Sequence, residues 1–478
     1  MKSMTSHWIG LMTACVFSVC SLWGKDSPPN IIFIFSDDWG WQDLSCHDHP
    51  YLQTPNIDRL AQEGADFTRF TVASPVCSPS RAAVMTGQFP ARHSIDGHFA
   101  WVDDNESRGM PDWLATDAPS LPRMLQQAGY KTAHYGKWHL SNEMIPDSPT
   151  PLAYGYDHYA AFNCSGEQMP YDHDVHHAID FIDRSSAAGA PFFINLWIHE
   201  PHTPFHVLPK YLKRFRHLEN DADQIYAATL AYADARIGEL LDHLDASGLA
   251  EDTLVIFSSD NGPARSRNPE SQPSLIYDAA TGAGFDLGAA KGITGGRKGC
   301  KASLHEGGLN VPFLVRWPAK IQPGTVDAQS FITAVDLLPT FCALAGASLP
   351  AGYTTDGLDY SSVLLGAPAP QRATPIFSRY NSGFVADEHW ATYTAIIDGY
   401  KLLLNPKTGR EELYYLVSDP KEQDDLLAAQ PARVAEMKAQ LAAWKATLPT
   451  VPAGDVFSSI RGNADAILET KKPYKRYK

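Results

Sequence analysis

The feature of this chain that most constrains its fold is a set of short, continuous apolar segments, each ending in polar or charged residues. Residues 30–35, 191–198 and 253–259 are rich in Ile, Leu, Val and Phe. A run without polar alternation is typical of a strand that is covered on both faces, as in the parallel sheets of α/β proteins. The longest amphipathic helix is expected at residues 221–244. The sequence therefore predicts an α/β fold, a doubly wound sheet with helices on both faces.

The pattern changes beyond about residue 375, where short segments with alternating polarity replace the apolar runs. They lie at residues 390–397, 401–404 and 412–416 and precede a helix at about 432–446. This pattern predicts a smaller antiparallel sheet with a terminal helix packed on it. The predicted organisation is a signal peptide at 1–24, a main α/β domain at 28–370 and a C-terminal subdomain at 371–478.

The N-terminus has the pattern of a secretory signal peptide, with Lys2 followed by an apolar run at residues 8–19. The run is shorter than the roughly 20 residues that a membrane-spanning helix needs. No later segment is long and apolar enough to cross a bilayer, so we expect no stable membrane span. The signal predicts a periplasmic or secreted protein. Because residues 12–15 weakly resemble a lipoprotein box, a lipid anchor on Cys15 is the alternative.

The composition bears on partners and metals. The 478 residues carry a formal net charge of −15, which disfavours nucleic acid as a partner. An anionic substrate would need a local cationic pocket. The cysteines outside the signal show no paired zinc-ligand spacing, and their connectivity cannot be read from the sequence.

Acidic residues follow two of the predicted strands. Asp37 and Asp38 come after the first, and Asp260 and Asn261 follow the strand at 253–259. Either pair alone is equally consistent with a solvated turn. Because a doubly wound fold brings the carboxyl ends of its strands to one edge, we expect the two pairs to converge. A set of oxygen ligands without His or Cys favours Ca²⁺ or Mg²⁺ over Zn²⁺.

The stretch at residues 77–87, Cys-Ser-Pro-Ser-Arg-Ala-Ala-Val-Met-Thr-Gly, is predicted to begin a helix. Pro79 suits the first turn and Ser78 is a candidate cap. Cys77 would then lie at a helix N-terminus, which favours an anion, and Arg81 would project toward the same anion from one turn later. A lone cysteine is more often a buried small apolar residue, but these neighbours favour a functional role.

This stretch resembles the maturation signature of the type I sulfatases, C-x-P-S-R followed by a hydrophobic residue and Thr-Gly. Three further segments resemble motifs of that family and occur in its order. They are Gly-Lys-Trp-His-Leu at 136–140, with Ser141 for the usual Gly; Pro-His-Thr-Pro at 201–204; and residues 301–308, with His305 for the usual Tyr and Asn310 for a usual Arg. The resemblance is to the arylsulfatase A and galactosamine-sulfatase group and implies an alkaline-phosphatase-like mixed sheet.

The resemblance also implies a cofactor set and roles for individual residues. Cys77 would be oxidised to formylglycine (3-oxoalanine), whose hydrate attacks sulfur, and one Ca²⁺ would be held by Asp37, Asp38, Asp260, Asn261 and residue 77. Arg81, Lys137 and Lys301 would stabilise charge, Asp260 would act as base, His202 as acid, and His139 would orient the hydrate. Because residues two apart in an extended chain share a side, Lys137 and His139 are expected to point the same way. The predicted substrate-binding residues are Lys137, His202, Lys301, His199, His98 and Trp101, with His199 open between substrate contact and packing.

The functional hypothesis is a sulfatase acting on a sulfated carbohydrate, such as a glycosaminoglycan or an algal polysaccharide fragment. Two loops, at residues 93–104 and 263–296, are expected to set the substrate. Maturation would need a formylglycine-generating or anaerobic sulfatase-maturing enzyme as partner. The alternatives are a formylglycine-dependent phosphonate or phosphodiester hydrolase and an inactive glycan-binding homologue.

Overall fold

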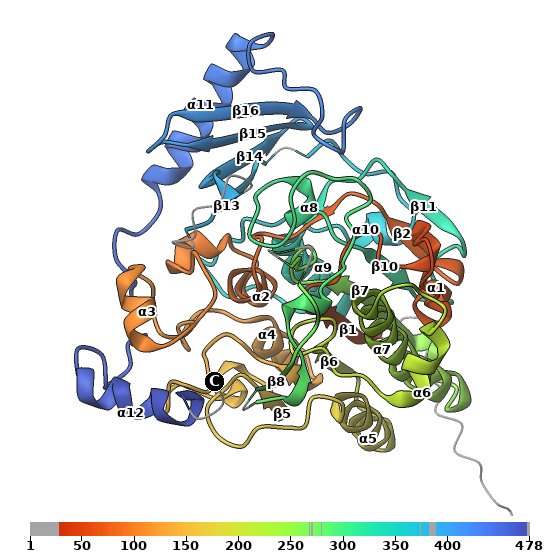
Figure 1. Cartoon of the computed structure of the whole chain (residues 1–478). Helices are drawn as coiled ribbons and strands as arrows, with labels where there is room; N and C mark the ends of the chain where they lie inside the picture. Colours follow the sequence, from red (N-terminus) through yellow and green to blue (C-terminus); the bar gives the residue numbers. More distant parts are fainter. Residues whose placement is uncertain are drawn as a thin grey trace, which may run out of the picture.

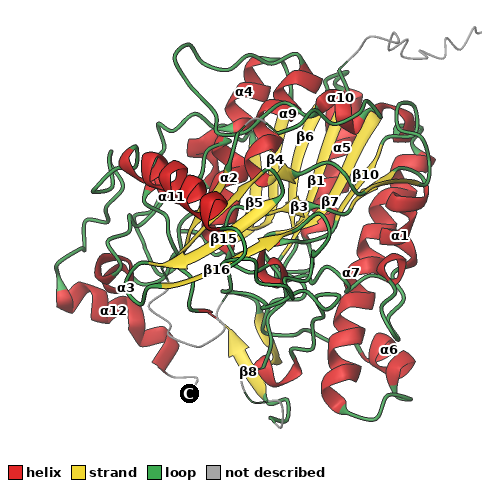
Figure 2. Cartoon of the chain, turned by 90° about the horizontal axis from the view of Figure 1, so that it is seen from above, coloured by secondary structure: helices red, strands yellow, loops and turns green. Residues whose placement is uncertain are grey.

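An eight-stranded mixed sheet forms the centre of the molecule, in the order β11-β2-β10-β7-β1-β6-β4-β5 (Figures 1 and 2). The computed structural model describes residues 28–475 except 267, 269, 270, 279, 373 and 382–388, so the predicted signal peptide lies outside it. The strands of this sheet are β1 Asn30–Ser36, β2 Ala65–Phe67, β4 Lys131–Lys137, β5 His158–Phe162, β6 Phe192–Trp197, β7 Thr253–Ser259, β10 Phe313–Arg316 and β11 Thr325–Asp327.

The sheet is parallel in its middle and mixed toward one edge. β1 pairs in parallel with both β6 and β7, and β4 pairs in parallel with β5 and β6. β10 runs antiparallel to β7 and β2. Four neighbouring strands, β7, β1, β6 and β4, therefore end at the same edge.

Side chains of β1 point alternately into two separate hydrophobic clusters. Ile31, Phe33 and Phe35 pack on one side, and Ile32 and Ile34 on the other. Each fully buried side chain of this size contributes about 1.5–3 kcal/mol through removal from water. The prediction of an α/β fold with helices on both faces of the sheet is confirmed.

The helices divide between these two faces, as Figure 1 shows. The first face packs against α2 Cys77–Thr86, α4 Leu121–Gln127, α9 Leu337–Ala345 and α10 Ser361–Leu364. The second packs against α1 Pro55–Gln62, α5 Asp174–Ala187, α6 Pro209–Leu212 and α7 Asp221–Ala246.

A second, four-stranded antiparallel sheet follows near the C-terminus, as predicted. The helix α11 packs on this sheet, and the ring of its Trp444 stacks on the ring of Phe377 in β13, with centroids 4.8 Å apart. The last helix, α12, lies beside α3 at the opposite end of the view in Figure 1. These elements are α3 Val102–Ser107, β13 Ile376–Arg379, β14 Tyr393–Ile397, β15 Tyr400–Asn405, β16 Arg410–Tyr415, α11 Pro431–Ala446 and α12 Ala464–Lys475.

Two segments are less regular than their residue patterns suggest. The apolar segment at 65–72 does not form one strand but contains β2 and the separate β3 Phe70–Thr71, which pairs with β12 Ile332–Thr333 outside the large sheet. The excursion at 263–296 contains a hairpin, β8 Leu275–Asp278 and β9 Gly282–Phe285, whose strands are antiparallel. The last residue of β9, Phe285, also forms an isolated bridge with Phe205. No helix in the described part of the chain is long and apolar enough to cross a membrane.

Two glycines test how closely β4 and β6 approach each other. Gly136 has φ +101°, and a Cβ atom there would lie 2.0 Å from the carbonyl oxygen of Trp197. Gly129 has φ +93°, and a Cβ atom there would have no neighbour within 4 Å. We expect Gly129→Ala to cost about 1–2 kcal/mol, from backbone strain alone, and Gly136→Ala to cost about 1–3 kcal/mol more, from overlap. Urea unfolding measures both, and equal losses in the two variants would contradict the close approach.

Candidate active site

The site lies where β1 and β7 end side by side. Ser36 and Ser259, the last residues of the two strands, are in register, so the acidic pairs that follow them are neighbours. The Asp38 N–H donates to Asp260 Oδ1 at 3.3 Å, and Asn261 Nδ2 donates to Asp38 Oδ1 at 2.7 Å. Topology thus brings together two pairs of oxygen ligands that lie far apart in the sequence.

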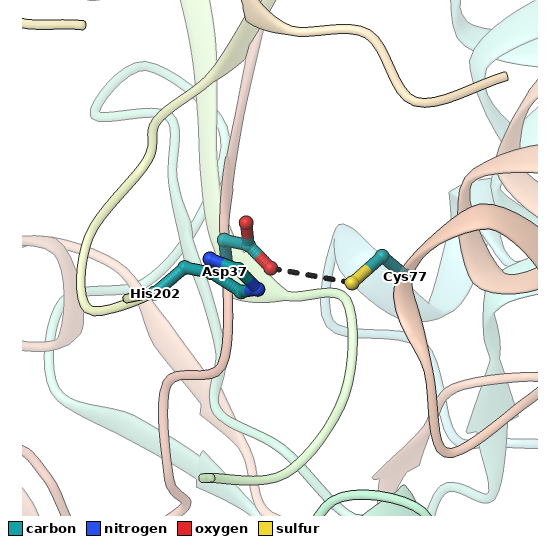
Figure 3. Close-up of side chains that lie close together, drawn as sticks. All are labelled: Asp37, Cys77 and His202. Carbon is teal, nitrogen blue, oxygen red and sulfur yellow. Dashed lines mark hydrogen bonds between the residues drawn. The ribbon is translucent and has the colours of Figure 1, made fainter. Parts of the chain in front are cut away.

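Cys77 faces this carboxylate group from the first residue of α2 (Figure 3). Its Sγ lies 3.5 Å from Asp37 Oδ1, 3.5 Å from Lys137 Nζ and 3.8 Å from Lys301 Nζ. Burial, with the neighbouring charges of Asp260 and Asp37, raises the pKa of the Cys77 thiol to about 12. The unmodified thiol is therefore protonated at neutral pH and is a weak nucleophile.

The cap that the sequence suggests for α2 is wrong. The N-cap is Val76, and no side chain caps the helix. Ser78 lies inside the first turn, where its Oγ accepts a hydrogen bond from the Phe99 N–H at 3.0 Å. Ser78 thus connects the Cys77 helix to the loop at 93–104, and the amides of the first turn remain available for an anion.

Three cations balance the three carboxylates of the site. Arg81 donates from Nε and Nη2 to Asp260 Oδ2, at 3.0 and 2.6 Å. Lys137 Nζ lies 2.5 Å from Asp37 Oδ2, and Lys301 Nζ lies 2.6 Å from Asp38 Oδ1. Buried charges are costly unless they are paired, so each cation is held in a defined place.

The donor set fits a hard divalent cation. Asp37, Asp38, Cys77 and Asp260 each offer a ligand atom, and these atoms lie within 4.8 Å of one another. Asn261 Oδ1 is buried and has no hydrogen-bond partner. An unpartnered buried oxygen beside three carboxylates is a ligand position for Ca²⁺ or Mg²⁺.

His202 lies beside Asp37 and Cys77 (Figure 3). Its Nε2 lies 4.0 Å from Asp38 Oδ2, and its Nδ1 lies 2.6 Å from the Thr203 carbonyl oxygen, which can only accept. Nδ1 therefore carries the proton, and Nε2 faces the site. Burial lowers the pKa of His202 well below its usual range, although the Asp37 charge opposes this.

His139 is placed differently from what the sequence suggests, and the structure bears on the role of His199 that the sequence left open. β4 ends at Lys137 and His139 has φ +51°, so the argument from an extended chain fails there. His139 Nε2 instead lies 3.0 Å from the Phe99 carbonyl oxygen. His199 is 2% exposed, and its Nε2 is 3.1 Å from the Pro204 carbonyl oxygen. This position favours packing over substrate contact.

The two remaining substrate candidates lie on the loop at 93–104. The His98 ring is 6.3 Å from the His139 ring, which places it at the margin of the site. Trp101 precedes α3, and Lys471 Nζ of α12 lies 5.3 Å from the centre of its ring. The face of the Trp101 ring toward α12 is therefore occupied by Lys471.

Sequence reasoning missed the support behind the His202 loop. The Glu200 carbonyl accepts from the Asp37 N–H at 3.3 Å, and the Glu200 side chain is 2.5 Å from Arg236 Nη2. Arg236 also pairs with Asp174. In the sequence, this network is indicated by one feature, which is the presence of Arg236 among the apolar residues of α7.

These features define a class before they define a family. An α/β sheet with oxygen ligands at its strand ends, a helix N-terminus and a ring of cations is the arrangement of a metal-assisted hydrolase of anionic esters. The sulfatase family model matches residues 29–347, and the model of the N-sulphoglucosamine sulphohydrolase C-terminal region matches residues 300–447. The chain belongs to the sulfatase family and is a sulfuric ester hydrolase by class.

Named relatives agree with this assignment. Arylsulfatase G of Rattus norvegicus is 30% identical over 426 residues, covering 78% of this chain and 75% of the relative. N-acetylgalactosamine-6-sulfatase of Canis lupus familiaris is 30% identical over 395 residues, 74% and 69% of the two chains. Arylsulfatase A of Homo sapiens is 30% identical over 391 residues, 73% and 70% of the two chains.

Solved structures show the same fold. The structure of Ps i-CgsB in complex with k-i-k-neocarrahexaose has a TM-score of 0.73 and 24% identity, covering 94% of this chain and 99% of that one. The structure of BT4656 with D-glucosamine-2-N,6-O-disulfate has a TM-score of 0.63 and 20% identity, with coverage of 88% and 98%. The phosphonate monoester hydrolase of Agrobacterium radiobacter has a TM-score of 0.60 and 20% identity, with coverage of 87% and 95%.

Removing one metal candidate tests the ligand set directly. We expect millimolar Ca²⁺ to raise the melting temperature of the wild type by several degrees, because a cation that binds only the folded state stabilises it. Asp38→Asn should lose most of this shift, since Asn keeps the shape and tolerates the φ of +70° at this position. Asp252→Asn, at an exposed carboxylate, is the control and should keep it. Equal shifts in both variants would remove Asp38 from the ligand set.

Asp43 holds the loop that follows Asp38 and provides a pH test. Its carboxylate accepts from the Gly40 and Ile293 N–H groups, at 2.9 and 3.0 Å, and from Tyr226 Oη at 2.8 Å, and His49 Nε2 lies 3.7 Å away. Burial raises the pKa of Asp43 to about 7. Its proton therefore stabilises the fold fully below the unfolded pKa, and this contribution is lost as the pH rises toward 7.

Asp43→Asn removes this titration. We expect the unfolding free energy of the variant, relative to wild type, to rise by about 2–3 kcal/mol between pH 5 and pH 8. Urea unfolding of both proteins at four pH values in that range measures the difference between their unfolding free energies. The contributions of the other titrating groups are the same in both proteins and therefore cancel in this difference. A difference that does not change with pH would show that Asp43 is ionised throughout.

Proposed function

We propose that this protein hydrolyses sulfate esters of a carbohydrate, with residue 77 as formylglycine and one calcium ion at the carboxylates. The observation that carries the proposal is the position of Cys77. Its Sγ lies between Asp37, a metal-ligand candidate, and the ammonium groups of Lys137 and Lys301. A hydroxyl group on the same Cβ would therefore meet both a cation site and the groups that hold a sulfate.

Two further groups would complete this site. As formylglycine, residue 77 would supply a hydrated aldehyde. One of its hydroxyls would attack sulfur as the bond from sulfur to the sugar oxygen breaks, and the second would then lose its proton, re-form the aldehyde and release sulfate. A calcium ion held by Asp37, Asp38, Asp260 and Asn261 would lower the pKa of that hydroxyl and neutralise sulfate oxygens.

The cations of the chain bind the sulfate group and the charge that it spreads during the reaction. Lys137 and Lys301 face residue 77 from two different segments, at the end of β4 and before α8. Arg81 reaches Asp260 from one turn further along α2. Preorganised charges of this kind act where charge develops, which is often the largest contribution in such reactions.

Asp260 and His202 are the proposed proton carriers. Burial, with the nearby charge of Asp37, raises the pKa of Asp260 to about 6, and a calcium ion bound to this carboxylate would lower it again. His202 carries its proton on Nδ1, so it can donate from Nε2 to the leaving oxygen only as an imidazolium. A bound sulfate monoanion beside the ring favours that charged form.

A carbohydrate substrate is supported by the surroundings of the site and by its structural neighbours. His98 and the loop at 93–104 border His139, and the β8–β9 hairpin pairs with Phe205 on the His202 loop. Two of the matching structures hold sugar ligands by name. We further propose export through the segment at 1–24 and maturation by a formylglycine-generating or anaerobic sulfatase-maturing enzyme.

A phosphonate or phosphodiester ester is the second candidate substrate, because the phosphonate monoester hydrolase shares the fold. Assay of aryl sulfate, aryl phosphonate and sulfated oligosaccharides on one preparation separates the two. We expect turnover of sulfates to exceed that of phosphonates. The reverse order would replace the sulfatase proposal.

The state of residue 77 is the first test. The tryptic peptide at 70–81, from protein made in the native host, should carry an aldehyde or its hydrate in place of the thiol. An intact thiol in an active preparation would exclude the formylglycine mechanism. An intact thiol in an inert preparation would favour the glycan-binding homologue.

Lys301 tests the cationic pocket. We expect Lys301→Ala to lower kcat by well over tenfold, because a preorganised charge at a developing anion typically contributes a few kcal/mol. Lys320→Ala, at an exposed lysine, is the control. Turnover of Lys301→Ala near that of the control would remove Lys301 from the proposed machinery.

A further inference from the structure

A buried ionic cluster joins the small C-terminal sheet to the loop that carries Lys301. Lys401 in β15 is fully buried, and its Nζ lies 2.7 Å from Glu306 Oε1 and 3.0 Å from Glu422 Oε1. Glu306 begins α8 (Glu306–Leu309), and its N–H donates to Glu422 Oε2 at 2.7 Å. One lysine thus pairs with two carboxylates that come from separate parts of the chain.

A second contact ties the same loop to the same sheet. Glu412 in β16 accepts from Lys298 Nζ at 2.8 Å and lies 3.0 Å from His305 Nε2. His305 Nδ1 lies 3.0 Å from Ser303 Oγ within the loop. The loop at 298–308 is therefore fixed to β16 at two separate points.

The other side of this loop is bonded to the segments that carry the catalytic candidates. The Lys301 N–H donates to the Pro263 carbonyl at 3.0 Å, just beyond Asn261, and the Ala302 N–H donates to the Pro75 carbonyl at 2.9 Å, just before Cys77. Gly262 packs so closely that a Cβ atom would lie 1.9 Å from the Gly307 carbonyl oxygen. Displacement of the loop would thus be transmitted to Lys301 and to its neighbours.

We propose that the C-terminal sheet positions Lys301 for catalysis through the Lys401–Glu306–Glu422 cluster. Lys401 is a positioning residue, because its ionic contacts go to Glu306 and Glu422 and not to residue 77 or the metal candidates. Without its charge, the buried carboxylates of Glu306 and Glu422 have no counter-charge, so at least one takes up a proton and the ionic contacts that hold the loop to β15 are lost. Lys301 Nζ then loses its defined position opposite Asp38 and residue 77. The inference rests on the proposed function for its kinetic consequence, and on the loop contacts alone for its structural one.

Arg316, on the far side of the sheet, offers a control, although its two carboxylate partners are partly exposed and those of Lys401 are buried. Arg316 in β10 also lies between two carboxylates, with Nε 2.5 Å from Glu63 and Nη2 3.0 Å from Asp245. Its side chain is 4% exposed. Arg316 is paired with Val255, near the start of β7, so it lies at the edge opposite to Asp260. Arg316→Met therefore removes a buried cation without touching the Lys301 loop.

The experiment compares Lys401→Met with Arg316→Met in the full-length protein, at a temperature where both are folded. We expect Lys401→Met to lower kcat by about tenfold or more, since small misplacements of a catalytic group are costly, with KM changed by less than about threefold. Arg316→Met should keep wild-type kcat, and Lys401→Arg should recover most of it. Equal kcat in the two Met variants would overturn the proposal.

Hydrogen–deuterium exchange gives a readout that does not depend on turnover. Amides at residues 298–308 should exchange faster in Lys401→Met than in wild type or Arg316→Met. If the wild type hydrolyses no sulfate ester, the proposed function has failed, and exchange alone decides whether the cluster holds the loop. Unchanged exchange in that loop overturns the positioning role. If Lys401→Met does not fold, Glu422→Ala tests the same cluster, because it removes both the contact to Lys401 and the acceptor of the Glu306 N–H, and the same changes are expected to a smaller degree.

Discussion

The structure depends on one electrostatic constraint, the meeting of Asp37, Asp38 and Asp260 at the ends of two paired strands. Ser36 and Ser259 are in register, so the carboxylates that follow them are held close together. All three are almost completely buried. Placing three buried carboxylates close together is strongly unfavourable, so positively charged side chains at fixed positions are needed to stabilise them. Arg81, Lys137 and Lys301 supply them from three other segments, so an acidic protein with a formal charge of −15 can still hold an anion locally.

This constraint explains why so much of the molecule supports one edge of the sheet. Arg236 holds the Glu200 loop from α7, Asp43 holds the turn after Asp38, and the C-terminal sheet holds the loop before α8. Each support adds its own buried charge or polar group, which is stable only because it is paired. The two hydrophobic clusters supply the burial energy that offsets these costs, since parallel strands covered on both faces remove large apolar areas from water.

Much of the fold could be predicted from the sequence, because the signals were local. The short apolar, β-branched-rich run at 30–35 is typical of a buried strand, and Asp37 and Asp38 follow its end. The position of Cys77 at a helix N-terminus also followed from its neighbours. The cap of that helix did not, because Ser78 bonds to Phe99 instead, and the backbone at His139 did not, because its left-handed conformation follows from tertiary contacts.

The sequence by itself determined the buried central strands β1, β6 and β7, the helix that begins at Cys77 and the family, because each depends on residue types at short spacing. The tertiary structure alone decided the partners of the buried charges. Lys401 and Glu306 are 95 positions apart, and Arg81 and Asp260 are 179 apart. Which cation faces which carboxylate depends on strand register and loop packing, and neither can be predicted from the residues of a short segment.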